Sequence, residues 1–530
     1  MSNNKKGLGE VFGGRNFASG LLVAIIIATV VFVNIIAYTL TSFFGLYIHS
    51  QNEEDFSISD ASEKLFRDAV EAGKSVNVIF CMDRKELENH ATGSFVHKTA
   101  LEFNDKYGDF INLVYVNVYT KLFSESEYDD YEVGGTFEAE EYKNYKETEN
   151  GREFAESTAI LPSSVIFEYV KKDEFGNEIK NYRVLTDAYT SSGFGDFYTL
   201  DSNLYMTSYN GEEVFSSMVA WVLRDEHPTA YMTIGHGEIA DLSLASALSC
   251  AGYHISYVDL KRESVPDDAG LVVISNPQND FERSTNQNKA TEISRLEAYR
   301  DRGGKILVTH DPYAKSLPVL EAFISGYGIE VAKTEAAENG QETVHIVKDS
   351  KEGIELDGFT LVAEHSDDET AKKMLSKTEE YGGRVILRDV AALKLSKEAK
   401  PLLVASSSAV CEAGGKTVDD EGGYALIAYS SHKTDSGKES LICFIPTVYL
   451  TASDAMITNG YANKNFLYSI FGELYGMGNM PYGAKSITFN DLVLENLTMG
   501  SARLYTALFM SVPVLVMIAG AVIMIRRKNR

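Results

Sequence analysis

The sequence predicts an α/β fold for the central part of the chain, with one transmembrane helix near each end. Helix and strand patterns alternate through the central part, and two long apolar stretches lie close to the termini. The strand-like runs are continuously apolar rather than alternating, which indicates strands covered on both faces. We therefore expect a doubly wound parallel sheet as the main architecture.

The first apolar stretch runs from Leu21 to Ala37 and is interrupted only by Thr29 and Asn34, after which it continues to Leu46. A length of roughly 25–30 residues crosses the hydrocarbon core with some tilt. A cleaved signal peptide would have an apolar region of about 7–15 residues followed by a small-x-small site. The longer stretch favours an uncleaved membrane helix, which we place at 17–48.

The second apolar stretch runs from Leu504 to Ile525 and ends in a basic cluster at 526–530. We place a membrane helix at 503–526. Basic residues lie outside both apolar stretches, so the positive-inside rule puts both tails, 1–16 and 527–530, in the cytoplasm. Residues of roughly 50–500 then lie on the outer side of the cell membrane.

The chain between the two predicted spans is strongly acidic. The whole sequence has a net charge of −27, residues 1–20 carry +2 and residues 503–530 carry +5, so the middle carries −34. Such a surface repels nucleic acid and anionic lipid headgroups, so we expect no nucleic-acid partner. The four cysteines, none in a C-x-x-C pair, are expected to be buried thiols, with one disulfide left open: Cys81, Cys250, Cys411 and Cys443.

Residues 55–205 are expected to form a first α/β module in which a helix precedes a strand twice. This order suggests a unit similar to the thioredoxin-like fold, although Cys81 has no cysteine two residues away to support redox chemistry. An acidic, tyrosine-rich insertion at 124–150 is expected to be a solvated loop. The expected elements are a helix behind a capping box of Asp60 and Glu63 that ends at Gly73, strands at 75–82 and 111–118, a helix at 95–107, and a hairpin around Phe175-Gly176-Asn177.

Residues 211–480 are expected to form the larger α/β domain, followed by a linker at 481–502. The segment 330–400 gives no clear pattern. The expected strands are 230–234, 254–260, 271–275, 305–309, 402–406, 424–429 and 441–446, and the expected helices are 214–223, 242–251, 291–302, 317–325 and 463–475.

The sharpest local signal is Gly235-His236-Gly237-Glu238, which follows a strand. Two glycines let the chain turn abruptly, and Glu238 is expected at the positive N-terminal end of the next helix. Asn276, His310 and Asp311 follow other strands. Because the carboxyl ends of parallel strands share one edge, these side chains are expected to converge there. Three interpretations stay open: capping and turn hydrogen bonds, ligand or partner binding, and catalysis or metal binding.

Several catalytic signatures are missing. Gly414-Gly415-Lys416-Thr417 imitates the end of a P-loop, but Val410 stands where the first glycine belongs and acidic residues follow. We interpret it as a surface loop, so any ATPase must be another polypeptide. The sequence contains no G-x-S-x-G, H-E-x-x-H or complete G-x-G-x-x-G motif.

An ordered series of motifs resembles the GldG-like, gliding-motility-type auxiliary subunits of ABC transporters, over roughly residues 57–526. It departs from the family pattern at Asn276, where glycine is expected before Pro277. The series comprises Gly211-Glu212-Glu213, the Gly-His-Gly-Glu turn, Asn276-Pro277, 303–308 up to Asp311-Pro312, 401–408 with 423–426, and Ser453-Asp454 with Asn465.

The resemblance implies thioredoxin-like and amidotransferase-like (flavodoxin-like) modules, a partner permease and a partner ATPase, and no established catalytic residue. We therefore expect a non-catalytic auxiliary membrane subunit without metal or cofactor. Its external domain would bind substrate, an envelope component or a partner subunit. An envelope hydrolase or metal-dependent enzyme using His236, Glu238 or Asp311 and a structural scaffold are the alternatives. The candidate ligand- or partner-binding residues are Gly235, His236, Gly237, Glu238, Asn276, His310, Asp311 and Asp454.

Overall fold

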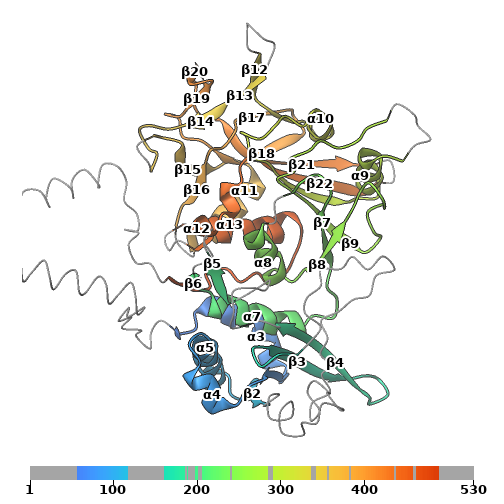
Figure 1. The fold of residues 1–530 in the computed structure, drawn as a ribbon, viewed down its shortest axis with the longest axis vertical. Helices are drawn as coiled ribbons and strands as arrows, with labels where there is room; N and C mark the ends of the chain where they lie inside the picture. The colour runs from blue at the N-terminus through green and yellow to red at the C-terminus, as the bar shows by residue number, and fades with distance from the viewer. Residues whose placement is uncertain are drawn as a thin grey trace, which may run out of the picture. The chain divides into compact units, whose positions relative to one another are not determined.

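A computed structural model describes residues 56–116, 160–185, 188, 197–200, 206–238, 241–284, 290–335, 342–354, 357–380, 383–434, 437–457 and 461–488. Both predicted membrane spans and the acidic insertion at 124–150 lie outside these residues. Within them, no helix combines the length and apolar character that crossing a bilayer requires. The chain is a mixed α/β protein, as predicted (Figure 1).

The first sheet has four strands in the order β2-β1-β3-β4. Strands β1 and β2 are parallel, whereas β3 runs antiparallel to both of its neighbours. The predicted hairpin is confirmed, and its two strands are longer than expected. The elements are α3 (Asp60–Glu71), β1 (Val76–Phe80), α4 (Arg84–Asn89), α5 (Gly93–Lys106), β2 (Ile111–Tyr115), β3 (Val165–Lys172) and β4 (Glu178–Leu185).

The start of α3 differs from the predicted capping box. Ser59, not Asp60, is the N-cap residue, and its side chain does not cap its own helix. The carboxylate of Glu212 instead accepts hydrogen bonds from Ser59 N at 2.7 Å and from Ser62 Oγ at 2.7 Å. A glutamate from a helix distant in the sequence thus accepts the N-cap N–H, which the N3 side chain of a capping box would otherwise accept.

Helix α7 (Gly211–Val222) is shared by both parts of the fold. All of its residues are buried, and it packs against α3, α5, β3 and β4 as well as against α8. Phe215 stacks on Phe103 at 4.4 Å between ring centroids and meets Phe167 edge-on. A helix that is buried on all sides belongs to the interior of a single core.

The large sheet contains five parallel strands in the order β8-β7-β9-β10-β22. Numbered along the chain, this order is 2-1-3-4-5. Beyond β22 the sheet continues with antiparallel partners, β21, β18, β15 and β16. The expected all-parallel sheet is therefore wrong for its second half. The parallel strands are β7 (Thr229–Thr233), β8 (His254–Val258), β9 (Ala269–Ser275), β10 (Lys305–Thr309) and β22 (Glu439–Ile445).

Helices cover both faces of the parallel strands, because alternate residues of each strand enter two separate cores. Val273 and Leu307 face the core that includes α8 and α13. Val272 and Ile306 face the core that includes α9 and α10. The helices are α8 (Leu242–Cys250), α9 (Glu292–Asp301), α10 (Pro318–Ser325) and α13 (Asn463–Ser469), the last continuing as a π-helical turn at Ile470–Leu474.

The segment without a clear pattern contains short strands and one helix. Part of the predicted linker 481–502 is also structured, because β23 (Ile487–Thr488) pairs with β6 (Met206–Tyr209). The remaining elements are β5 (Tyr198–Leu200), β11 (Ile329–Val331), β12 (Lys333–Glu335), β13 (Glu342–Val344), β14 (Ile346–Lys348), β15 (Thr360–His365), α11 (Glu369–Glu380), β16 (Val385–Arg388), β17 (Leu393–Leu395), β18 (Ala399–Val404), β19 (Val410–Ala413), β20 (Lys416–Asp419), β21 (Ala425–Lys433), η3 (Tyr449–Thr451) and α12 (Ser453–Ile457).

Candidate functional site

The loops that follow β7, β9, β10 and β22 meet at the carboxyl edge of the parallel strands. The carbonyl of His236 accepts hydrogen bonds from Gln278 N at 2.9 Å and from Asn279 N at 2.8 Å. His310 N donates to the carbonyl of Ile445 at 3.1 Å. The structure therefore brings the loops that carry His236, Asn276, His310 and Asp311 to the same edge.

The side chain of His236 is completely enclosed, with 0% of its surface exposed. Nδ1 lies 3.0 Å from Glu238 Oε1, and Nε2 lies 2.8 Å from Glu292 Oε1. The ring also stacks on Phe281, with 3.8 Å between ring centroids. Burial alone would lower the pKa of His236, but the hydrogen bonds and charges of the two carboxylates outweigh it and raise the pKa. Both nitrogens are thus engaged within the protein.

The two glycines of the turn are required by their backbone conformation. Gly235 has φ +105° and Gly237 has φ +72°, values that side-chain-bearing residues rarely adopt. Glu238 does not lie at the N-terminus of the next helix as expected. Helix α8 begins at Leu242, and Asp241 caps it by accepting from Leu244 N at 2.9 Å. The carboxylate of Glu238 turns back to His236, accepting from His236 N at 2.7 Å.

Asn276 and Asp311 act together to position a residue that the sequence did not single out, Tyr313. Asn276 Oδ1 accepts from Asp311 N at 3.1 Å, and Asp311 Oδ1 accepts from Tyr313 N at 2.9 Å. The phenol of Tyr313 donates to Asp389 Oδ1 at 3.2 Å. Desolvation and the charge of Asp389 raise the pKa of Tyr313 to about 12, so the phenol stays protonated as a donor.

The same relay contains two backbone positions in the left-handed region. Asn276 has φ +43° and Asp389 has φ +49°. Asparagine and aspartate tolerate this conformation better than other side chains, but it still costs free energy, and such positions cluster at functional sites. Tyr313 is nevertheless 62% exposed. The fold therefore holds an exposed aromatic ring in a fixed place.

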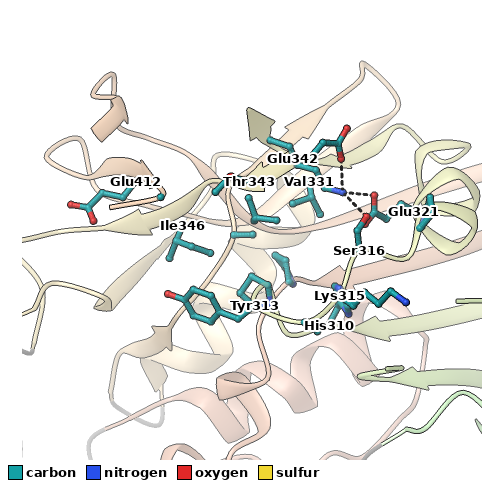
Figure 2. A pocket seen from close by; sticks show the side chains of 18 of the residues that line it. His310, Tyr313, Lys315, Ser316, Glu321, Val331, Glu342, Thr343, Ile346 and Glu412 are labelled. Carbon is teal, nitrogen blue, oxygen red and sulfur yellow. Dashed lines mark hydrogen bonds and ion pairs between the residues drawn. The ribbon is translucent and has the colours of Figure 1, made fainter. Parts of the chain in front are cut away.

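A cavity of about 1020 Å³ lies beside Tyr313. Its walls come from the loop after β10, from β12 and β13, from β14, and from the turn between β19 and β20 (Figure 2). Figure 2 shows Tyr313 and Ile346 in one part of the cavity and Ser316, Glu321 and Glu342 in another. The carboxyl edge therefore carries an open pocket next to β10 and β22, whereas the surroundings of His236 are filled by side chains.

An ion-pair network lines one part of this pocket. Lys333 Nζ contacts Glu321 Oε2 at 2.5 Å, Glu342 Oε2 at 3.3 Å and Ser316 Oγ at 3.3 Å. Burial would raise the pKa of Glu321, but the hydrogen bond from Lys333 outweighs it and lowers the pKa. The hydroxyl of Ser316 donates to Glu321 Oε1 at 2.9 Å. A single ammonium group thus binds both carboxylates in the pocket wall.

His310 is the one predicted candidate whose side chain lines the pocket. Its Nδ1 is buried and has no hydrogen-bond partner among the described residues. Burial lowers the pKa of the His310 ring, in spite of the nearby charges of Glu321 and Asp311. A neutral imidazole offers one donor and one acceptor, which suits hydrogen bonding to a bound molecule.

Asp454 lies apart from this group, exposed at the start of α12, which packs against α13, η3 and β5. Its Oδ1 accepts from Ala455 N at 2.9 Å. Gly414 and Gly415 form the turn between β19 and β20, both with positive φ, as the surface-loop interpretation expects. They also line the pocket.

Sequence reasoning missed Tyr313, Lys333 and Glu321. Tyr313 stands two residues after Asp311, so the rule that strand ends carry functional side chains could have been extended to it. Lys333 lies in the segment whose periodicity is uninformative, because its strands are only a few residues long. Nothing in the local pattern predicts that these residues meet Glu321 of α10.

The four cysteines all lie in the part of the chain that the structure describes. All four cysteines are free and buried, and burial raises the pKa of Cys81, Cys250 and Cys411 to about 12. Among the residues that the structure describes, no group of three or more His, Cys, Asp or Glu side chains is arranged to hold a metal ion.

Comparison with known proteins identifies no family. No family model matches the sequence, and no curated protein matches it. Among solved structures, the chain is similar to the mmIFT52 N-terminal domain (TM-score 0.34, 15% identity, covering 50% of this chain and 100% of that one). It is also similar to PurLQS from Thermotoga maritima (TM-score 0.26, 14% identity, covering 47% of this chain and 100% of that one). A third similar structure is a ThuA-like protein from Bacteroides uniformis (TM-score 0.28, 10% identity, covering 49% of this chain and 96% of that one). Likenesses this distant do not assign a function.

Proposed function

We propose that this protein is a non-catalytic auxiliary subunit of an ABC-type transport complex, held in the cell membrane by spans at 17–48 and 503–526. Its external domain binds a ligand, an envelope component or a partner subunit. Its partners are a permease, a separate ATPase and the lipid bilayer. Nucleic acid is not among its partners. The motif series of the GldG-like family is the source of this proposal.

The strand orders support the modules that the resemblance implies. An order of β2-β1-β3-β4 with only β3 antiparallel is the arrangement of a thioredoxin-like sheet. The order 2-1-3-4-5 of the five parallel strands is that of flavodoxin-like folds. We propose both modules on this basis, and α7 joins them into one core.

The enclosure of His236 carries the non-catalytic part of the proposal. In a flavodoxin-like order, the switch point lies between the first and third strands, here β7 and β9. His236 follows β7, and its ring nitrogens are bound to Glu238 and Glu292 while Phe281 covers its face. A catalytic histidine needs access to substrate. His236 lacks such access, because its ring is enclosed by Glu238, Glu292 and Phe281.

The pocket beside Tyr313 supports the binding part of the proposal. It lies at the same edge of the sheet, where ligands of open α/β folds bind. It combines apolar walls with a few polar groups, as small-molecule sites do.

Purification of the full chain in mild detergent tests the proposal. We expect an ATPase and a multi-span permease to copurify. Recovery of neither, under conditions that keep other transporters intact, would count decisively against it. Protease added to cells without their wall should cleave the external domain; full protection, with the tails accessible from outside, would mean that the topology is inverted.

The enzyme and scaffold alternatives make different predictions. An enzyme that uses His236 loses activity in His236→Gln while its domain stays folded and its complex stays assembled. A scaffold tolerates changes in the pocket, and only changes in its interfaces or spans affect it. In our proposal, His236→Gln acts through stability, whereas Tyr313→Ala acts through binding.

A further inference from the structure

Most of the charged residues around the pocket beside Tyr313 are engaged in ion pairs. Glu321 and Glu342 share Lys333, and Glu412 pairs with Lys348 at 3.0 Å. His310 is neutral near pH 7 because burial lowers its pKa. Lys315 is exposed at the pocket wall. Four of the five charged residues of the lining, Glu321, Glu342, Glu412 and Lys333, are thus engaged in ion pairs.

A charged ligand gains little in such a site. It would lose its hydration and find most of the opposite charges already engaged, so little of the desolvation cost would be offset. The groups still able to hydrogen bond are the His310 imidazole and the backbone and hydroxyl groups of the wall. An uncharged molecule with several hydroxyl or amide groups uses them without this cost.

Two aromatic rings give the pocket apolar faces. Tyr313 is fixed at its backbone by Asp311 and at its phenol by Asp389, yet most of its surface is open. Phe359 is half-buried in the wall, with Lys348 Nζ 4.9 Å from its ring centroid. A rigid aromatic ring offers contact area at a low entropic cost. The C–H face of a sugar ring suits such a platform.

We propose that this pocket binds a neutral oligosaccharide, with one sugar ring stacked on Tyr313 and a hydroxyl or amide hydrogen-bonded to His310. The inference rests on the proposed function, because it names the ligand class of the external domain. A free sugar and the end of an envelope glycan present the same chemistry.

Saturation-transfer NMR on the full chain, in a detergent without a sugar headgroup, tests the proposal. The probes are triacetylchitotriose and maltotriose, which are neutral, the deacetylated glucosamine trimer, which is cationic, and trigalacturonate, which is anionic. We expect the neutral trimers to bind and both charged trimers to bind more weakly. Tyr313→Ala should weaken binding by about tenfold or more, and Tyr313→Phe should weaken it less because the ring remains.

Phe175→Ala is the matched control. Phe175 is an aromatic residue with 88% of its surface exposed, at the tip of the β3–β4 hairpin and outside the pocket lining. Its loss should leave sugar binding unchanged. The proposal is overturned by tighter binding of a charged trimer, by no transfer to either neutral trimer, or by equal effects of Tyr313→Ala and Phe175→Ala.

A pelleting assay with insoluble chitin separates the two sources of the sugar. Binding to polymer as well as trimer indicates an envelope glycan, whereas binding to the trimer alone indicates a soluble sugar; either supports the ligand class. Copurification of the ATPase and permease is a separate readout. If the protein binds sugar but neither partner copurifies, only the auxiliary-subunit proposal is overturned. If the partners copurify but the protein binds no sugar, only the ligand class is overturned.

Discussion

Asn276 Oδ1 accepts the backbone N–H of Asp311 at 3.1 Å, so a left-handed residue after β9 holds the loop that follows β10. This bond also positions Tyr313, because Asp311 Oδ1 accepts the backbone N–H of Tyr313. The departure from the glycine expected before Pro277 therefore has a structural reason. Glycine would accept the backbone conformation but would leave Asp311 N without this acceptor.

Asn276→Ala is expected to lower the free energy of unfolding by about 1–3 kcal/mol, because it removes the buried acceptor and keeps the strained backbone. Asn276→Gly should cost less, since glycine relieves the strain. Urea denaturation gives both values. Asn479→Ala is the control, because Asn479 also has positive φ (+56°) but is exposed. Equal losses at the two positions would show that the bond to Asp311 contributes nothing.

His236→Ala is expected to cost about 3–5 kcal/mol of stability, because it leaves the buried carboxylates of Glu238 and Glu292 facing each other without a shared partner. Chemical denaturation measures the loss. Adding Glu292→Gln to His236→Ala should restore part of it by removing one charge. A double variant less stable than the single one would contradict this account.

The raised pKa of His236 predicts a loss of stability as pH rises above 6.5. The folded protein holds this proton more tightly than the unfolded chain, so the contribution is complete below the ordinary value of 6.5 and is lost as pH rises through the folded pKa. The free energy of unfolding should therefore fall with pH in this window. His236→Gln should remove that slope, and an unchanged slope in this variant would assign it to another group.

His365 predicts the opposite dependence at acid pH. Burial lowers its pKa to about 4, so the unfolded chain takes up the proton first and stability falls as pH drops from 6.5 towards 4. His365→Leu should flatten this part of the stability curve. His432→Leu, at an exposed position on β21, is the control and should leave the curve as it is.

Glu212→Ala is expected to cost about 2–4 kcal/mol, because its carboxylate accepts from Ser59 N, Ser59 Oγ, Ser62 Oγ and Lys485 N. Hydrogen exchange should accelerate at the amides of Ser59 and Lys485 together, since one carboxylate binds both. Glu63→Ala should change neither amide, because the partly exposed side chain of Glu63 pairs with Arg67 and Lys106 instead. Faster exchange at only one of the two amides would separate the contacts.

Long apolar runs were the predictable part of the fold. Strand 305–309 is β10 with the same bounds, and the helix expected at 242–251 ends one residue earlier in α8. The antiparallel half of the large sheet was not predictable, because Leu402 and Ile427 are buried like residues of parallel strands. Burial shows whether a strand is covered but not which direction its neighbour takes.

The candidate site also has one part that the sequence predicts and one part that it does not. Strand ends place His236, Asn276, His310 and Asp311 at one edge, and this follows from the order of elements. Whether a side chain is enclosed depends on distant residues such as Glu292, which comes from α9, and Phe281. The pocket itself needs Lys333 and Glu321 to meet across elements, and no spacing in the sequence encodes that meeting.

The bond between Ser57 and Lys485 joins residues 428 positions apart, and β23 completes the sheet of β5 and β6 only after the whole segment between β6 and β23 has been made. During synthesis, the buried carboxylate of Glu212 cannot accept the N–H of Lys485 until the chain has grown by a further 273 residues. The described domain therefore cannot finish folding before β23 has been made. Until then, a chaperone would meet an exposed edge at β6, and its release would be timed by the arrival of β23.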